Sequence, residues 1–222
     1  MKKNRYYKIL IGAISCAFFL YSFWQAYLIK TLEIVPTKQS YYYLVSTSKN
    51  VSASTKNAYF QGGAGYLLEN DGKKYAVYSV YDTLTKAERS RENLSERNLE
   101  VKTLRIKTGD VYLKGKNRRK KAEIRRVLET LSISATILSD LSRGAEDGRY
   151  SQSRLREMLE VVKGSLNAFK KGEFVYDYAK EGRQKIEKMQ EGIVYAKDVR
   201  YVEVLLCDCY QKFCAKFPIY FV

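Results

Sequence analysis

A single long apolar run dominates the start of the chain. From Ile9 to Ile29 there are 21 residues without a formal charge. As a helix they would span roughly 31 Å, close to the hydrocarbon thickness of a bilayer. Basic residues precede the run and only Lys30 follows it closely, which by the positive-inside rule places the N-terminus in the cytoplasm. The pattern predicts a transmembrane helix over residues 9–30 after a cytoplasmic tail, residues 1–8.

Two other interpretations of this run are weaker. A cleaved signal peptide has a shorter apolar core and a small-x-small cleavage site, which this run lacks. A lipoprotein would use Cys16, but apolar sequence continues for 13 residues after it. We therefore expect an uncleaved single-pass anchor in the cell membrane, partnered by the lipid bilayer, with the remaining domains outside the cytoplasm.

After a linker, residues 31–40, the pattern alternates between periods of two and of about 3.6 residues. The aromatic and β-branched segments are typical of strands, the polar segments between them of short helices, and Asp71-Gly72 of a tight hairpin turn. The predicted elements are a strand (41–47), a helix (49–60), a hairpin (66–81), a helix (83–98) and an irregular or bulged strand (99–107). This β-α-β-β-α-β order predicts a small ferredoxin-like unit over residues 41–116.

Residues 117–222 carry the spacing of amphipathic helices. Apolar residues recur every three or four positions from Ile124 to Leu141, a loop follows at 143–148, and the pattern restarts at Leu155. Lys171-Gly172 breaks it before a third helical stretch. We expect an antiparallel helical hairpin or a three-helix bundle. The predicted fold class is thus α+β, with the transmembrane helix, the ferredoxin-like unit and this helical domain in series.

Composition narrows the chemistry. The chain has no histidine, which excludes Ser-His-Asp and Cys-His nucleophile systems and histidine metal sites. The formal net charge of +16 suits an anionic neighbour such as lipid headgroups, a cell-wall polymer or nucleic acid, or simply a solvated surface. Nucleic acid is not the expected partner, because the basic domains are predicted to lie outside the cell.

The cysteines and carboxylates give little sign of a reactive centre. Cys207, Cys209 and Cys214 lie close together, but residues two apart on a helix point in different directions. Buried thiols are the favoured interpretation, and a disulfide or a metal remains an alternative. Most carboxylates lie beside Lys or Arg, as on a solvated helix surface. We predict no catalytic residue, no metal site and no cofactor, and hence no enzyme.

Tyrosine is the most informative residue type. The chain has 20 Tyr, and eight of them fall in or beside the strands and helix predicted between residues 41 and 81. Strand alternation would place about half of these rings on the sheet face away from the helices. Such a face, with nearby lysines, suits stacking on sugar rings or bases. The alternative is that most of the rings pack in the core.

The segment Tyr41–Lys107 resembles the SPOR domain, the peptidoglycan-binding module of bacterial division and sporulation proteins. The resemblance rests on YYYLVST as first strand, on GGAGYLLENDGKKYAVYSVYDTLTKAE as hairpin and second helix, and on LEVKTLRIK as last strand. It implies binding of glycan strands stripped of stem peptides across an open sheet face. The residues it implicates are Tyr43, Tyr75, Tyr78 and Ser79, with Gln61 at the rim.

These observations predict a membrane-anchored, non-enzymatic protein that binds peptidoglycan glycan strands in cell division or sporulation. The alternative is a membrane-tethered scaffold whose C-terminal helices bind a division or sporulation protein, without glycan binding.

Overall fold

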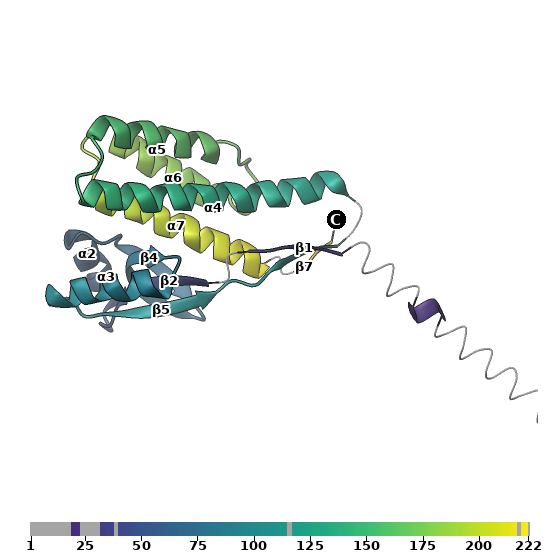
Figure 1. The fold of residues 1–222 in the computed structure, drawn as a ribbon, viewed down its shortest axis with the longest axis horizontal. Helices are drawn as coiled ribbons and strands as arrows, with labels where there is room; N and C mark the ends of the chain where they lie inside the picture. The colour runs from purple at the N-terminus through teal and green to yellow at the C-terminus, as the bar shows by residue number, and fades with distance from the viewer. Residues whose placement is uncertain (1–18, 23–31, 38–39, 115–116, 217–218, 222) are drawn as a thin grey trace, which may run out of the picture.

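The computed structural model describes residues 19–22, 32–37, 40–114, 117–216 and 219–221. Outside the short piece at 19–22, these residues form an α+β fold of six long helices and two sheets (Figure 1). The elements are β1 (Leu32–Val35), β2 (Ser40–Ser46), α2 (Val51–Phe60), β3 (Tyr66–Asn70), β4 (Lys73–Tyr81), α3 (Leu84–Glu96), β5 (Val101–Lys107), β6 (Val111–Lys114), α4 (Arg118–Glu146), α5 (Gln152–Leu166), α6 (Tyr176–Gln190), α7 (Ala196–Lys216) and β7 (Ile219–Phe221).

The β-α-β-β-α-β unit forms a four-stranded sheet with the order β3-β4-β2-β5, in which all neighbours are antiparallel. The β3–β4 hairpin turns at Asp71 and Gly72, whose φ angles are +50° and +70°. These left-handed conformations fit the strand twist, which is why Asp-Gly is favoured there. Side chains of Asn50 and Thr83 cap the N-termini of α2 and α3 by accepting backbone N–H groups.

The helical domain has four helices, so the predicted hairpin or three-helix bundle is wrong in number. The third predicted stretch is interrupted after Gln190, and a new helix, α7, begins at Ala196. The loop predicted at 143–148 is also shorter than expected, because α4 continues to Glu146. Gly144 lies inside that last turn. The ring of Tyr150 packs over it, so a residue with a Cβ would not fit at this position.

Helix α7 covers the sheet face that was expected to be open. Figure 1 shows α7 between the four-stranded sheet and the other helices of the bundle. Tyr41, Tyr43, Val45, Leu68 and Val77 on this face join the large core cluster together with side chains of α7 and α4. The opposite face packs on α2 and α3 through Leu44, Ala58, Tyr78, Ala87 and Val101. The sheet is therefore buried on both sides.

A second, three-stranded sheet joins segments far apart in the chain. Its order is β1-β6-β7, with β1 antiparallel and β7 parallel to β6. The predicted linker at 31–40 thus contains a strand, and Val111–Lys114 belongs to this sheet instead of the ferredoxin-like unit. That unit ends at Lys107. Its last strand is also regular, since the register shift lies in the β2–β4 pair and the β2–β5 register is continuous.

The transmembrane helix predicted for residues 9–30 is not part of the described fold. Among the described residues, no helix is long and apolar enough to cross a membrane. Only residues 19–22 of the predicted segment are described, and the rest of it lies outside the described residues. The predicted fold class is therefore corrected in this element, since the described fold contains no transmembrane helix.

Candidate functional site

The five residues predicted to contact glycan do not share one surface. Tyr43 is fully buried, and its hydroxyl donates to Oε1 of Gln211 in α7 at 2.5 Å. Burial raises the pKa of Tyr43 well above its ordinary value. Tyr75 is half-buried on the same face, where it packs against the large core cluster with Lys102 Nζ 5.8 Å from its ring centre. Tyr43 therefore joins the sheet to α7 and has no contact with solvent.

Tyr78 and Ser79 face the other side of the sheet because of a β-bulge. In the β2–β4 register Leu44 is opposite Ser79 and Val45 is opposite Val77, which leaves Tyr78 as the extra residue. Two successive residues of the bulged strand then lie opposite one partner residue, and strict alternation fails. Both Tyr78 and Ser79 line a cleft on the α2/α3 side. This bulge is why sequence alternation did not assign their face.

The cleft has a volume of about 410 Å³ and lies where the ferredoxin-like unit meets the helical bundle. Polar side chains dominate its lining, which comes from the loop after α2, β4, α3, the end of α4 and the start of α7. The lining residues are Gln61, Gly62, Gly63, Tyr78, Ser79, Tyr81, Ser90, Asn93, Leu94, Arg97, Glu146, Asp147 and Arg200. Three of the five predicted residues, Gln61, Tyr78 and Ser79, are thus brought together here.

The glycine-rich loop after α2 forms one wall of the cleft. The N–H of Gly63 donates to Ala58 O at 2.8 Å, and the N–H of Ala64 donates to Tyr78 O at 2.7 Å, so the loop lies against β4. The Tyr78 hydroxyl donates to Gln61 Oε1 at 2.9 Å, which fixes the Gln61 side chain at the rim. Burial raises the pKa of Tyr78, so this hydroxyl remains a donor at neutral pH.

Because this wall is tightly packed, Gly63→Ala is expected to lower the free energy of unfolding by about 1–3 kcal/mol. An added Cβ would lie 2.8 Å from Tyr78 Cδ1 and 3.0 Å from the Ala58 carbonyl oxygen, neither of which is a flexible chain end. Urea unfolding checks the loss. Gly109→Ala is the control, since a Cβ there meets nothing within 4 Å. Equal stability of the two variants would contradict the packing described.

Charged side chains of the cleft come from three remote segments. Arg200 of α7 donates to Gly62 O at 2.8 Å and forms an ion pair with Glu146 at the end of α4, which ties the loop to the bundle. Arg97, at the C-terminus of α3, is exposed and makes no ion pair with the described part of the chain. Asn93 and Ser90 lie on the same helix, and Ser90 Oγ accepts the Tyr81 hydroxyl at 2.6 Å. Only the fold brings these residues together, so no sequence motif marks them.

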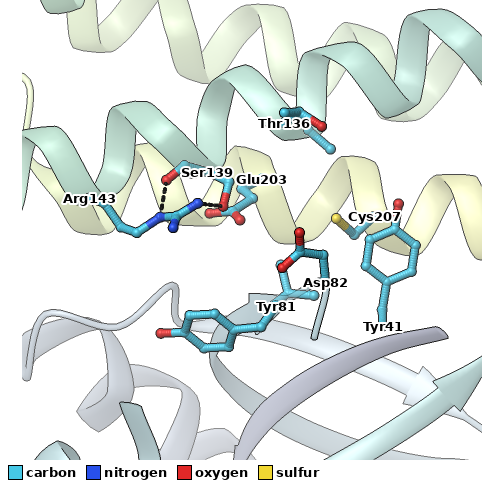
Figure 2. A pocket seen from close by; sticks show the side chains of 10 residues that line it. Tyr41, Tyr81, Asp82, Thr136, Ser139, Arg143, Glu203 and Cys207 are labelled. Carbon is cyan, nitrogen blue, oxygen red and sulfur yellow. Dashed lines mark hydrogen bonds between the residues drawn. The ribbon is translucent and has the colours of Figure 1, made fainter. Parts of the chain in front are cut away.

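A separate, smaller cavity of about 50 Å³ lies deeper, between the sheet, α4 and α7 (Figure 2). Figure 2 shows Arg143 and Ser139 of α4 facing Glu203 of α7 across this seam. The Glu203 carboxylate is buried and accepts the Ser142 hydroxyl at 3.3 Å. Its pKa is raised to about 7, chiefly because burial disfavours the charged form, although Ser139 and the nearby Arg200 and Arg143 act in the other direction.

The cysteines do not form a reactive centre in the described structure. Cys207, Cys209 and Cys214 are buried, and no disulfide joins any two of them. Burial raises the pKa of Cys214 to about 12, which disfavours a reactive thiolate. Within the described ranges, no three His, Cys, Asp or Glu residues are placed to hold a metal ion. The favoured interpretation of these residues as buried thiols agrees with their burial.

Comparison with known proteins gives no relative for this chain. No protein-family model, no curated protein and no solved structure matches it. The resemblance to SPOR domains therefore rests on the residues quoted for it alone.

Proposed function

We propose that this protein is a non-catalytic binder of cell-wall glycan, and that the polar cleft holds the saccharide in place of the covered sheet face. The observation that carries the proposal is the meeting of Gln61, Tyr78 and Ser79 in one cleft. These are three of the residues that the SPOR resemblance implicates in glycan contact. Tyr43 and Tyr75, which belong to the covered face, have no part in it. A role in cell division or sporulation stays a prediction of that resemblance.

The chemistry of the cleft suits sugar hydroxyls. A saccharide presents many donors and acceptors, and the amide of Asn93, the hydroxyl of Ser79 and the guanidinium of Arg97 offer complementary groups. Tyr78 and Tyr81 add aromatic edges among these polar groups. The volume of about 410 Å³ lies in the usual range for small-ligand sites. Glu146 and Asp147 offset Arg97 and Arg200, so the cleft selects neither anions nor cations strongly.

We expect Arg97→Ala combined with Asn93→Ala to weaken glycan binding about tenfold, because each side chain would lose about one hydrogen bond to the saccharide. Both residues are exposed at the end of α3 and support no packing, so the fold should remain. The measurement is co-sedimentation with glycan strands freed of stem peptides, across a concentration series of the 222-residue chain.

The matched control is Arg89→Ala, an exposed arginine of the same helix that does not line the cleft. It should bind as the unaltered chain does. Equal losses in both variants would indicate a non-specific charge effect, and unaltered binding by the double variant would remove the cleft from the proposal.

A scaffold that binds a partner protein through the helical domain is the second candidate. The specific observation in its favour is that α7 occupies the sheet face on which the resemblance places glycan. The sedimentation experiment separates the two candidates, since a folded chain that fails to bind glycan strands at any concentration tested supports the scaffold.

A further inference from the structure

The three-stranded sheet has two outer strands, β1 and β7, and the outer edge of β1 lies beside a groove. β1 is an outer strand of the order β1-β6-β7, and its residues pair with β6 from Leu32 opposite Lys114 to Val35 opposite Val111. Among the described residues no strand pairs with the other edge of β1. An unpaired edge presents backbone N–H and C=O groups, which is a template for another extended chain. β1 has no lysine or proline within it to block such pairing, and Pro36 comes only after its end.

A groove of about 610 Å³ runs beside this edge, between β1 and α4. The wall on the β1 side is made of four consecutive residues, Glu33 to Pro36, of which the last follows the strand. Adjacent side chains of a strand point to opposite faces, so a wall of consecutive residues includes the backbone edge itself. The α4 wall consists of side chains from one helix face, at positions 125, 128, 129, 132 and 133.

The two walls expose apolar side chains that have no cover in the described structure. Ile34 on β1 is 55% exposed and Ile133 on α4 is 59% exposed, while Leu128 is buried at the floor. Ile34 points to the strand face opposite that of Glu33, which pairs with α4, so the two isoleucines leave exposed apolar surface on different sides of an added strand, each available to apolar side chains of a ligand. The unpaired edge and the apolar groove therefore require the same kind of occupant, an extended polypeptide.

Charge around the groove specifies that occupant further. The Glu33 carboxylate is already paired with Arg125 and lies 3.6 Å from Lys121 Nζ. The first turn of α4 adds three exposed cations, Arg118, Arg119 and Lys120, which make no ion pair within the described ranges. Glu129 also lines the groove, so the excess of positive charge lies beside the groove, at the first turn of α4. An occupant with acidic side chains would complement it.

We propose that the free edge of β1 and the groove beside it bind an extended segment of a partner protein, which adds as a fourth strand and carries alternating apolar and acidic side chains. Because alternate side chains of a strand point to opposite faces, the apolar side chains would lie on the face toward α4, against Ile133, and the acidic ones on the other face would be attracted by the positive charge of the nearby first turn of α4. This is β-strand addition, in which backbone hydrogen bonds give affinity and side-chain pockets give specificity. The proposal is independent of glycan binding, since the saccharide cleft lies at the other end of α4.

The test uses the 222-residue chain and a labelled eight-residue peptide of alternating valine and glutamate, followed by fluorescence anisotropy. We expect saturable binding. A peptide in which a central valine is replaced by proline should bind about tenfold more weakly, because proline lacks a backbone donor. A peptide with lysine in place of glutamate should also bind about tenfold more weakly, and its deficit should shrink at high salt.

Ile133→Glu should weaken binding of the valine–glutamate peptide about tenfold, by placing a charge in the groove. The matched control is Val161→Glu, at a helical position of similar exposure, 57%, on α5. It should bind normally, which separates loss of the groove from a general effect of added negative charge. Both substitutions are at exposed positions, so circular dichroism should show the unaltered fold.

Three results would overturn the proposal. Equal binding of the proline-containing peptide would show that no strand is added. Equal loss in the Val161→Glu control would show that the groove is not the site. A dimer in sedimentation equilibrium that Ile133→Glu dissociates would assign the edge to a second copy of this chain instead of a partner peptide.

Discussion

Residues 40–107 produced without the four helices of the bundle should not form a stable folded monomer. Removing the bundle would expose the sheet face that α7 covers, including the fully buried side chains of Tyr43, Val45, Leu68 and Val77. Burial of such a side chain contributes about 1.5–3 kcal/mol, so the face as a whole contributes on the order of 10 kcal/mol. That is as large as the net stability of an ordinary domain. The two hydrogen bonds from Tyr43 to Gln211 and from Tyr66 to Asp208 would also be lost.

Three measurements detect this loss of stability: thermal unfolding by circular dichroism, binding of an apolar dye, and sedimentation. We expect no cooperative transition, strong dye binding and aggregation. A matched variant of the same fragment, with Tyr43, Leu68 and Val77 replaced by threonine, should bind less dye and remain more soluble. A cooperative transition in the unaltered fragment, without dye binding, would contradict the role given to α7.

Glu203→Gln should abolish a loss of stability that the unaltered chain shows as the pH rises. The pKa of Glu203 is raised from 4.5 to about 7, so the folded state holds this proton more tightly than the unfolded state does. The stabilisation is complete below pH 4.5 and is lost as the pH rises through 7. A shift of this size corresponds to ~3 kcal/mol, because each pKa unit is about 1.4 kcal/mol. Glutamine keeps an acceptor for the Ser142 hydroxyl without a charge to bury.

Urea unfolding at pH 5 and pH 8 measures this effect. The unaltered chain should be less stable at pH 8 than at pH 5 by up to ~3 kcal/mol from this group alone. The glutamine variant should lack that difference and be the more stable protein at pH 8. Glu187→Gln, at an exposed position of α6, is the control and should retain the pH dependence. An identical pH dependence in the Glu203 and Glu187 variants would show that ionisation of Glu203 does not lower the free energy of unfolding.

Local signals in the sequence predicted the ferredoxin-like unit well. The Asp71-Gly72 turn fixes the hairpin because both residues adopt positive φ. The spacing of Ile124, Leu128 and Leu131 likewise predicted the buried stripe of α4. These features depend on neighbours a few residues away, which is why a single sequence reveals them.

The covering of the sheet by α7 was not predicted, although α7 carries a signal for it. From Val202 to Gln211 every residue of the helix is buried, including the polar Glu203 and Asp208. A helix that is apolar on nearly all sides packs between two layers instead of on a surface. Glu203 and Asp208 obscure this pattern, because carboxylates are seldom fully buried. Asp208 in fact accepts the Tyr66 hydroxyl at 2.7 Å and pairs with Lys212.

The cleft could be anticipated only in part. The SPOR resemblance implicates Tyr78 and Ser79 on an open sheet face with Gln61 at its rim, whereas the β-bulge at Tyr78 places the two strand residues on the α2/α3 side. Arg97 and Arg200 come from segments about a hundred residues apart, so their meeting depends on how the bundle docks on the sheet.

The central helix of this fold, α7, leaves the ribosome after the strands that it covers. The strands that α7 covers are made more than a hundred residues earlier, and at about 5–20 residues per second they wait several seconds for it. During that interval the tyrosine-rich sheet has no partner for one of its faces. Docking of the bundle on this sheet should therefore wait for α7, and nascent chains should bind ribosome-associated chaperones until α7 has emerged.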